Sequence, residues 1–208
     1  MYLPVHFKMD ELAAIHAAMR ASRLATLVTA SADGLIATPL PLILDESEGE
    51  HGTLYGHVAR PNPQWNTPMI GEAMAIFTGP DAYVTPSWYA TKAEHGKVVP
   101  TWNYVAVHAY GMAEFFEDAD RLLAVVTRLT NLNEQTREKA WQVSDAPADF
   151  IKAQLRGIVG LRLPITRIDA KRKMSQNRKL EDRVGVVAGL GGSDDPVDRE
   201  VAAMISTT

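Results

Sequence analysis

Residues 24–44 read LATLVTASADGLIATPLPLIL, and this stretch decides the fold class. Its first seven residues are β-branched or aliphatic, a composition typical of a β-strand. Asp33 and Gly34 predict a tight turn, because both residue types tolerate the backbone angles that a hairpin needs. A second strand is expected directly after the turn, as far as Leu44. Pro39 and Pro41 cannot donate backbone hydrogen bonds, so this strand should follow a sheet edge, a bulge or a ligand.

Further short strands are expected along the chain, at residues 53–58, 73–78, 82–85, 98–116 and 159–168. Helical patterns lie on both sides of them: one after Asp10, one capped by Asp118, one at residues 149–155 and one that begins at Asp195-Pro196. Many short strands accompanied by helices predict an α+β fold, a small barrel with flanking helices.

The domain organisation follows from the same pattern. We expect one barrel domain over residues 1–190, followed by a linker and a C-terminal helix over residues 191–208. The linker is expected at residues 189–195, whose sequence GLGGSDD is rich in glycine and polar residues.

Composition excludes several classes of protein. The 208 residues include no cysteine, which excludes disulfides, thiolate nucleophiles and cysteine-ligated metal sites. The net charge of −4 is unlike that of a protein whose main partner is nucleic acid. Neither a secretory signal nor an apolar run of the roughly 20 residues that a membrane span needs is present. The six histidines are scattered without metal-ligand spacing, so we expect no metal site. Together, these features lead us to expect a cytoplasmic protein without a membrane contact.

Two similar stretches form a doublet, PSWY at residues 86–89 and PTWNY at residues 100–104. If they pair as a hairpin centred on His95, Trp88 faces Trp102. Alternation then places four polar side chains on the opposite face of the sheet: Ser87, Tyr89, Thr101 and Asn103. Flat rings together with a row of hydrogen-bonding groups suit a flavin. The alternative is an ordinary cross-strand aromatic pair in the core with exposed polar neighbours.

A second candidate is GHVARPNPQ at residues 56–64, which delivers His57, Arg60 and Asn62 at the end of a strand. An arginine offers a planar fork that fits phosphate oxygens, and the histidine can donate to a phosphate or a hydroxyl. The alternative is a polar loop in which Asn62 caps a helical turn.

The third candidate is KRKMSQNRK at residues 171–179, within a stretch of seven basic and three acidic residues from Arg167 to Arg183. Such a segment could contact a cofactor phosphate, a second subunit or a nucleic-acid backbone. It could also be an ordinary solvated surface.

These motifs, together with the N-terminal MYLPVHF, resemble in type and order the PaiB family, whose members are often labelled FMN-binding negative transcriptional regulators. The resemblance runs from Met1 to about Leu190. It implies a split β-barrel related to pyridoxamine-phosphate oxidase and flavin reductases, with FMN bound at the interface of a homodimer. It also implies a bacterial cytoplasmic protein associated with repression of sporulation and protease genes.

The resemblance and the motifs together give the expected FMN contacts: His57, Arg60, Asn62, Ser87, Trp88, Tyr89, Thr101, Trp102, Asn103, Lys171, Ser175, Gln176 and Asn177. We expect Arg60 to pair with the FMN phosphate, with Lys171 or Arg178 as the competing candidates. No residue is recognisable as catalytic or as a DNA reader, so a DNA contact rests on the family alone. An FMN-dependent oxidoreductase or flavin reductase acting on a small molecule, and a flavin carrier without turnover, remain as alternatives.

Overall fold

A computed structural model describes residues 1–207, and the chain divides into two compact units. Unit 1 combines three segments: Met1–Ala18, Thr78–Val107 and the chain from Asp169 onward. Unit 2 combines the two segments between them, Met19–Phe77 and His108–Ile168. No helix among residues 1–207 has both the length and the apolar composition that crossing a bilayer requires.

The strands form two sheets. The first has the order β2-β1-β5-β6-β9, with bounds β1 (Ala25–Ser31), β2 (Gly34–Leu40), β5 (Ala73–Val84), β6 (Thr101–Gly111) and β9 (Arg167–Lys173). The second has the order β3-β4-β8-β7, with bounds β3 (Ile43–Asp45), β4 (Thr53–Ala59), β7 (Glu114–Phe116) and β8 (Ile158–Pro164). With its helices, the molecule has the predicted α+β architecture.

The expected hairpin is confirmed in unit 2. β1 pairs with β2 from Ala25 opposite Leu40 to Ser31 opposite Gly34, whose φ of +120° suits a glycine at the turn. β2 is an edge strand, as Pro39 predicts. The strand expected to run on to Leu44 is interrupted, because β2 ends before Pro41 and β3 begins after it.

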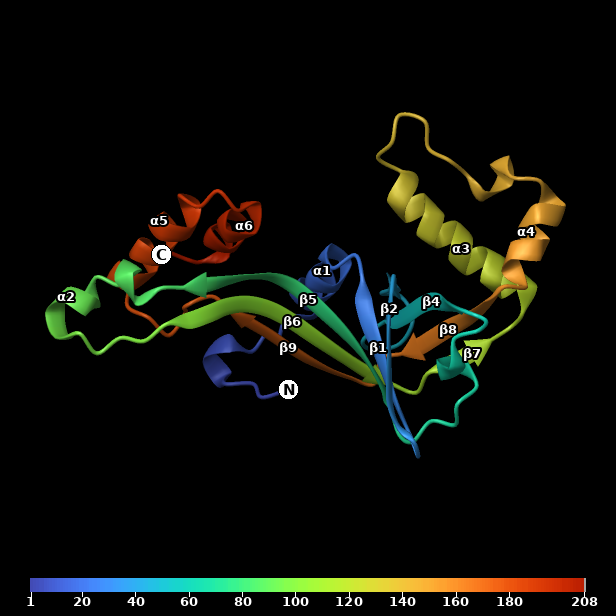
Figure 1. Ribbon diagram of the computed structural model, residues 1–208, viewed down its shortest axis with the longest axis horizontal. Helices are drawn as coiled ribbons and strands as arrows, with labels where there is room; N and C mark the ends of the chain where they lie inside the picture. The colour runs from blue at the N-terminus through green and yellow to red at the C-terminus, as the bar shows by residue number, and fades with distance from the viewer. Residues whose placement is uncertain (208) are drawn as a thin grey trace. The chain divides into compact units, whose positions relative to one another are not determined.

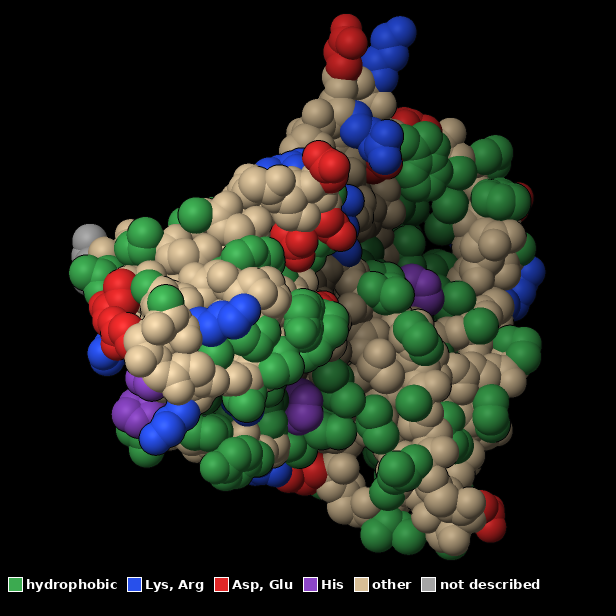
Figure 2. Space-filling view, turned by 60° about the vertical axis from the view of Figure 1, so that its left-hand side comes forward, with side chains coloured by type: hydrophobic (Ala, Val, Ile, Leu, Met, Phe, Trp, Pro, Cys, Tyr) green, Lys and Arg blue, Asp and Glu red, His purple; other side chains and the backbone are tan. Residues whose placement is uncertain are grey.

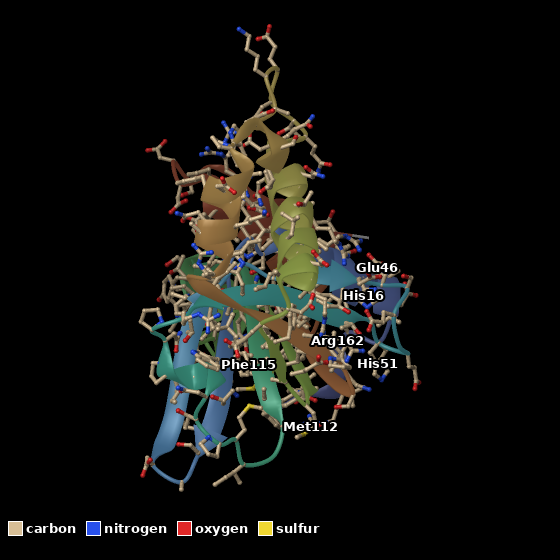
Figure 3. The ribbon with its side chains drawn as sticks, turned by 90° about the vertical axis from the view of Figure 1, so that its right-hand side faces the viewer. His16, Glu46, His51, Met112, Phe115 and Arg162 are labelled. Atoms are coloured by element: carbon tan, nitrogen blue, oxygen red, sulfur yellow. The ribbon has the colours of Figure 1, made fainter. Side chains whose placement is uncertain are left out.

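Two helices of unit 2, α3 (Ala119–Glu134) and α4 (Ala148–Leu155), cover the four-stranded sheet (Figure 3). The Asp118 carboxylate accepts a hydrogen bond of 2.8 Å from the Arg121 backbone N–H, which confirms the predicted cap. The apolar stripe of α3 enters a core whose buried members include Leu122, Val125, Leu129, Phe116 and Leu155.

Unit 1 is built on neighbouring strands that carry helices at one end (Figure 1). Its helices are α2 (Thr91–His95), α5 (Leu180–Gly191) and α6 (Pro196–Met204), and α1 (Leu12–Ala21) begins in this unit. Asp195 accepts a hydrogen bond from the Val197 N–H, so the predicted cap of α6 is confirmed.

The expected linker is shorter than its glycines suggest. Helix α5, which sequence patterns did not indicate, continues to Gly191, and α6 packs on it through the buried Val201 and Leu190. Only residues 192–195 connect the two helices. The domain boundary at residue 190 stays a prediction.

Four strand predictions were wrong in detail. Residues 73–78 and 82–85 belong to the single strand β5, because Gly79 is needed for a close approach rather than for a turn: a Cβ there would lie 2.9 Å from the Val105 Cβ. The strand expected over residues 98–116 divides into β6 and β7. The strand expected over residues 159–168 ends at Pro164, and the basic segment begins a further strand, β9.

Candidate functional site

The two halves of the aromatic doublet do not form a hairpin. Residues 86–88 form a 3-10 helix, η3 (Pro86–Trp88), and the Thr85 hydroxyl caps it by accepting from the Ser87 N–H at 3.3 Å. Proline at the first helical position and threonine before it favour such a turn over a strand. Ser87 and Tyr89 therefore do not share a sheet face with Thr101 and Asn103, and that prediction was wrong.

The two tryptophans have separate surroundings within unit 1. Trp88 packs on α5, where Gly185 and Gly189 leave room for it: a Cβ at Gly189 would lie 2.2 Å from the indole ring. Trp102 is 52% exposed, and its ring meets Tyr83 edge-on, with 6.1 Å between centroids. The predicted Trp88–Trp102 pair does not form, but Trp102 and Tyr83 present flat apolar surface to solvent.

Other predicted residues do come together, although they are far apart in the sequence. The buried Asn103 amide on β6 donates a hydrogen bond of 3.0 Å to the Ser175 hydroxyl, in the turn that follows β9. Ser175 has φ of +62°, the only positive φ of a non-glycine residue among residues 1–207. Holding a serine there costs about 1–3 kcal/mol, so the surrounding contacts must fix this turn.

Gln176 also shapes the turn. Its side-chain carbonyl accepts from the Met174 N–H at 2.6 Å, and its amide donates to the Arg172 carbonyl at 2.5 Å. Asn177 is exposed at the tip. The motif is thus a rigid turn that carries basic side chains on either side.

Three of those basic side chains, Lys171, Lys173 and Arg178, form what we call the basic cluster. Lys171 is only 7% exposed, with its ammonium 3.3 Å from the Tyr2 carbonyl and 5.2 Å from the centroid of the Tyr104 ring. The Tyr2 ring centroid lies 5.7 Å from the same ammonium, so a backbone carbonyl and two aromatic rings hold this buried cation.

The other two cations are held in the same way. The Lys173 ammonium donates to the Trp102 carbonyl at 2.6 Å and to the Thr101 hydroxyl. The Arg178 guanidinium lies 4.6 Å from the centroid of the Tyr89 ring.

The electrostatics of the basic cluster are unbalanced. Within residues 1–207, none of its three cations forms an ion pair with a carboxylate. Burial, together with the charges of Lys171 and Arg178, lowers the pKa of Lys173. Burial also raises the pKa of Tyr89, whose hydroxyl is buried and has no hydrogen-bond partner in the described part of the chain. Because cations withdrawn from water without an opposite charge are costly, this arrangement suits an anionic ligand.

In the loop of unit 2, at residues 56–64, the positive charge is paired with a carboxylate. Arg60 forms an ion pair with the Glu117 carboxylate. Its Nε donates to the Arg156 carbonyl at 2.6 Å, and a terminal nitrogen donates to the Ile158 carbonyl at 3.3 Å. The predicted phosphate ligand is therefore already paired with groups of its own unit.

The amides of this loop hold its backbone in place. The Asn62 side-chain oxygen, Oδ1, accepts a hydrogen bond of 2.9 Å from the Gln64 N–H, which confirms the alternative interpretation of Asn62 as a cap. The Asn62 amide also donates to the Thr38 hydroxyl at 2.9 Å. Gln64, which the sequence analysis did not single out, is fully buried, and its amide nitrogen lies 3.1–3.2 Å from three acceptors on β1 and β2. The sequence did offer one indication that Gln64 has a structural role, because it directly follows the capping pair Asn62-Pro63.

His57 lies on β4 opposite Gly160. Burial lowers the pKa of His57, and its Nδ1 atom is buried without a hydrogen-bond partner among the described residues. A neutral imidazole is the form that this environment favours.

Sequence comparison places the chain among known proteins. The family model described as "Putative FMN-binding domain" matches residues 1–167. The protease synthase and sporulation protein PAI 2 of Bacillus subtilis (strain 168) is 32% identical over 206 residues, which cover 99% of this chain and 96% of that protein. An uncharacterized protein of Aspergillus fumigatus is 35% identical over 193 residues, 73% of this chain and 74% of the other, so such relatives also occur in fungi.

Solved structures share the fold. The flavocytochrome Anf3 of Azotobacter vinelandii matches with a TM-score of 0.60 and 13% identity, over 83% of this chain and 72% of that one. The FAD and heme binding protein of Mycobacterium smegmatis matches with a TM-score of 0.56 and 14% identity, over 80% and 73% of the two chains. The predicted split-barrel fold is confirmed.

Proposed function

Because the chain belongs to the FMN-binding domain family, together with the PAI 2 protein of Bacillus subtilis, we propose that its basic cluster holds the phosphate of FMN. The observation that carries this proposal is a set of three cations, one of them buried, that no carboxylate balances within residues 1–207. FMN ends in a phosphate dianion, which needs positive partners wherever it leaves water. Arg60, which the sequence led us to expect at the phosphate, is the competing candidate.

The surroundings of the basic cluster also suit the rest of a flavin. Lys173 donates to the Trp102 carbonyl, so the basic cluster adjoins the strand that exposes the Trp102 ring. Tyr83 extends this surface. A flat apolar platform beside a phosphate site is what a ring system with a phosphorylated side chain requires. When bound, FMN would supply the redox chemistry, and this chain would bind and orient it.

We also propose that the protein works as a homodimer. Large apolar side chains of unit 2 are exposed at Leu35, Ile70 and Met112, the last of which is labelled in Figure 3. Leu35 lies on the edge strand β2, and exposed apolar side chains at the edge of a sheet invite a partner. Light scattering at micromolar concentration should give twice the chain mass, and a stable monomer would contradict this.

For the cellular role, we propose a regulator whose state depends on bound FMN. The support is the similarity to PAI 2, which is named for protease synthesis and sporulation. A direct DNA contact would have to be local: the net charge is −4, and on the face drawn in Figure 2 basic and acidic side chains are intermingled. A gel shift with the upstream region of its own gene should show at most weak, salt-sensitive binding.

An FMN-dependent oxidoreductase acting on a small molecule is the second candidate. The specific observation in its favour is the shared fold with a flavocytochrome and with a FAD and heme binding protein. Anaerobic NADPH should bleach the flavin absorbance of an oxidoreductase of this kind and leave that of a regulator unchanged.

The binding proposal itself is tested on the purified protein. Its absorption spectrum should show a bound flavin, and mass spectrometry should identify the released ligand as FMN. Protein reconstituted with FMN should bind it at least about tenfold more tightly than riboflavin, because one charge-assisted contact is worth about 1.5–3 kcal/mol. Equal affinities for FMN and riboflavin would contradict the assignment of the phosphate to the basic cluster.

A further inference from the structure

Unit 2 contains a cavity of about 520 Å³ that shares no residue with the candidate flavin contacts. It lies between residues 19–23, the connection from β2 to β3, and the C-terminal end of α3. Pockets that bind small molecules commonly have volumes of about 300–1,000 Å³, so this one is large enough for an organic ligand.

Part of the wall of the cavity is apolar, whereas Ser22, Asn133 and Thr136 add polar groups to the lining. Met19, Phe77 and Leu129 line it and are themselves buried in the core of the unit. Leu132, half exposed at the end of α3, continues the apolar lining toward solvent. An aliphatic or aromatic ligand body would lose its contact with water here, which favours binding.

The rim is basic. Arg20, Arg23 and Arg137 line the cavity, and no aspartate or glutamate is among the lining residues. Arg20 pairs with Glu46, which is labelled in Figure 3, and Arg137 pairs with Glu134 at 3.0 Å.

The Arg20–Glu46 pair is exposed, and exposed pairs contribute little stability, so an incoming carboxylate can replace Glu46. The Glu134 side chain is only 22% exposed and also accepts a hydrogen bond from the Trp141 N–H, but the Arg137 side chain is 64% exposed and has donors left for a ligand. Arg23 forms no ion pair within residues 1–207. The rim therefore has one guanidinium without a counter-charge, one whose partner is easily exchanged, and one, Arg137, that is exposed and can contact a second anion.

We propose that this arginine-rimmed pocket binds an organic acid with an apolar body and a single carboxylate, of the class of short and medium-chain fatty acids. The apolar body would pack against Phe77 and Leu129, and the carboxylate would meet Arg23 and Arg137. The guanidinium fork matches the two oxygens of a carboxylate, and the apolar part of the wall adds contacts that a small inorganic anion cannot make. This inference does not depend on where FMN binds.

Isothermal titration of the full-length protein with octanoate, and separately with 1-octanol, tests the proposal. The expected result is one octanoate per chain, with 1-octanol at least about tenfold weaker because it lacks the charge. The double variant Arg23→Gln/Arg137→Gln should lose octanoate affinity by at least about tenfold, since it removes two charge-assisted contacts. Arg156→Gln, an exposed arginine of the same unit outside the pocket, is the matched control and should bind as the parent does.

A second variant distinguishes the loss of the carboxylate site from the loss of the fold. Leu132→Glu changes a half-exposed side chain and places an acid in the lining, so it should weaken octanoate clearly more than 1-octanol, which loses only an apolar contact. Circular dichroism and flavin content should match the parent in every variant. Equal affinity for octanoate and 1-octanol, or full octanoate affinity in the double variant, would overturn the proposal.

Discussion

The loop at residues 56–64 and the turn at residues 171–178 carry the same kinds of side chain, yet their charges are balanced differently. Arg60 in the loop binds the Glu117 carboxylate and two backbone carbonyls. The three cations of the basic cluster contact carbonyls, a hydroxyl and aromatic rings, and no carboxylate among residues 1–207 pairs with them. A basic residue indicates an anion site only when the fold leaves its charge unopposed.

The amides of the two regions have similar roles. Asn62 and Gln64 fasten the loop to neighbouring backbone, and Asn103 fastens the turn through Ser175. Sequence comparison treats the two regions differently. The family model matches residues 1–167, which include the loop but not the turn, whereas the alignment with PAI 2 covers 99% of the chain. Variants of the two regions can therefore decide between them.

The largest expected effect comes from removing two cations of the basic cluster together. Lys171→Met/Lys173→Met keeps most of the buried volume and removes two charge-assisted contacts, so FMN affinity should fall by about a hundredfold or more. Fluorescence titration measures it. Riboflavin, which has no phosphate, is the control and should bind as it does to the parent. A similar loss for both ligands would mean that the variant damages the fold.

A change in the loop should instead affect stability. Gln64→Leu removes the side-chain donor to the buried Leu27 carbonyl and the half-buried Ile36 carbonyl, which should lower the free energy of unfolding by about 1–3 kcal/mol. Urea unfolding measures this loss, and the exposed Gln154→Leu should stay within about 0.5 kcal/mol of the parent. FMN affinity of folded Gln64→Leu should change little. A large loss of FMN affinity would make the loop part of the flavin site.

The pH dependence of FMN affinity sharpens the comparison further. Burial and the neighbouring cations lower the pKa of Lys173, and binding of a phosphate requires the protonated amine. Affinity should thus be complete below the pKa of Lys173 and fall as the pH rises through it, at a lower pH than for an ordinary lysine. Riboflavin titrated in parallel corrects for ionisation of the flavin ring. If the FMN affinity of Lys173→Met falls with pH in the same way, while riboflavin affinity does not, the titrating group is a residue other than Lys173.

The smallest effect is expected from releasing Arg60. Glu117→Gln removes its counter-charge, and because we place the phosphate elsewhere, FMN affinity should stay within about twofold of the parent. A clear tightening of FMN alone, absent for riboflavin, would show that Glu117 competes with the phosphate for Arg60. This charge-neutral substitution keeps the size of the side chain, so changes of packing are minimal.

Local chemistry made much of the fold predictable. Asp118 and Asp195 cap helices where the sequence indicates, and the hairpin at Asp33-Gly34 forms as expected. One prediction failed where a tertiary contact decides, because Gly79 allows the Val105 side chain to approach rather than making a turn. Another failed because a local signal was overlooked: the Thr85 cap and Pro86 make residues 86–88 a helical turn instead of a strand.

The candidate site was predictable in part. Its basic residues and the family resemblance, now confirmed, could be identified from motifs. The pairing of Arg60 with Glu117 could not, because the two residues are 57 positions apart and nothing local joins them. The contact between Asn103 and Ser175, 72 positions apart, was hidden for the same reason.

A single pair of titrations tests the central claim most directly. FMN and riboflavin are titrated against Lys173→Met and Arg60→Met under identical conditions, with flavin fluorescence as the readout. We predict that Lys173→Met weakens FMN by about tenfold to a hundredfold and leaves riboflavin unchanged, while Arg60→Met binds both ligands within about threefold of the parent. The reverse pattern, with FMN lost in Arg60→Met and retained in Lys173→Met, would contradict the account and place the phosphate in the loop.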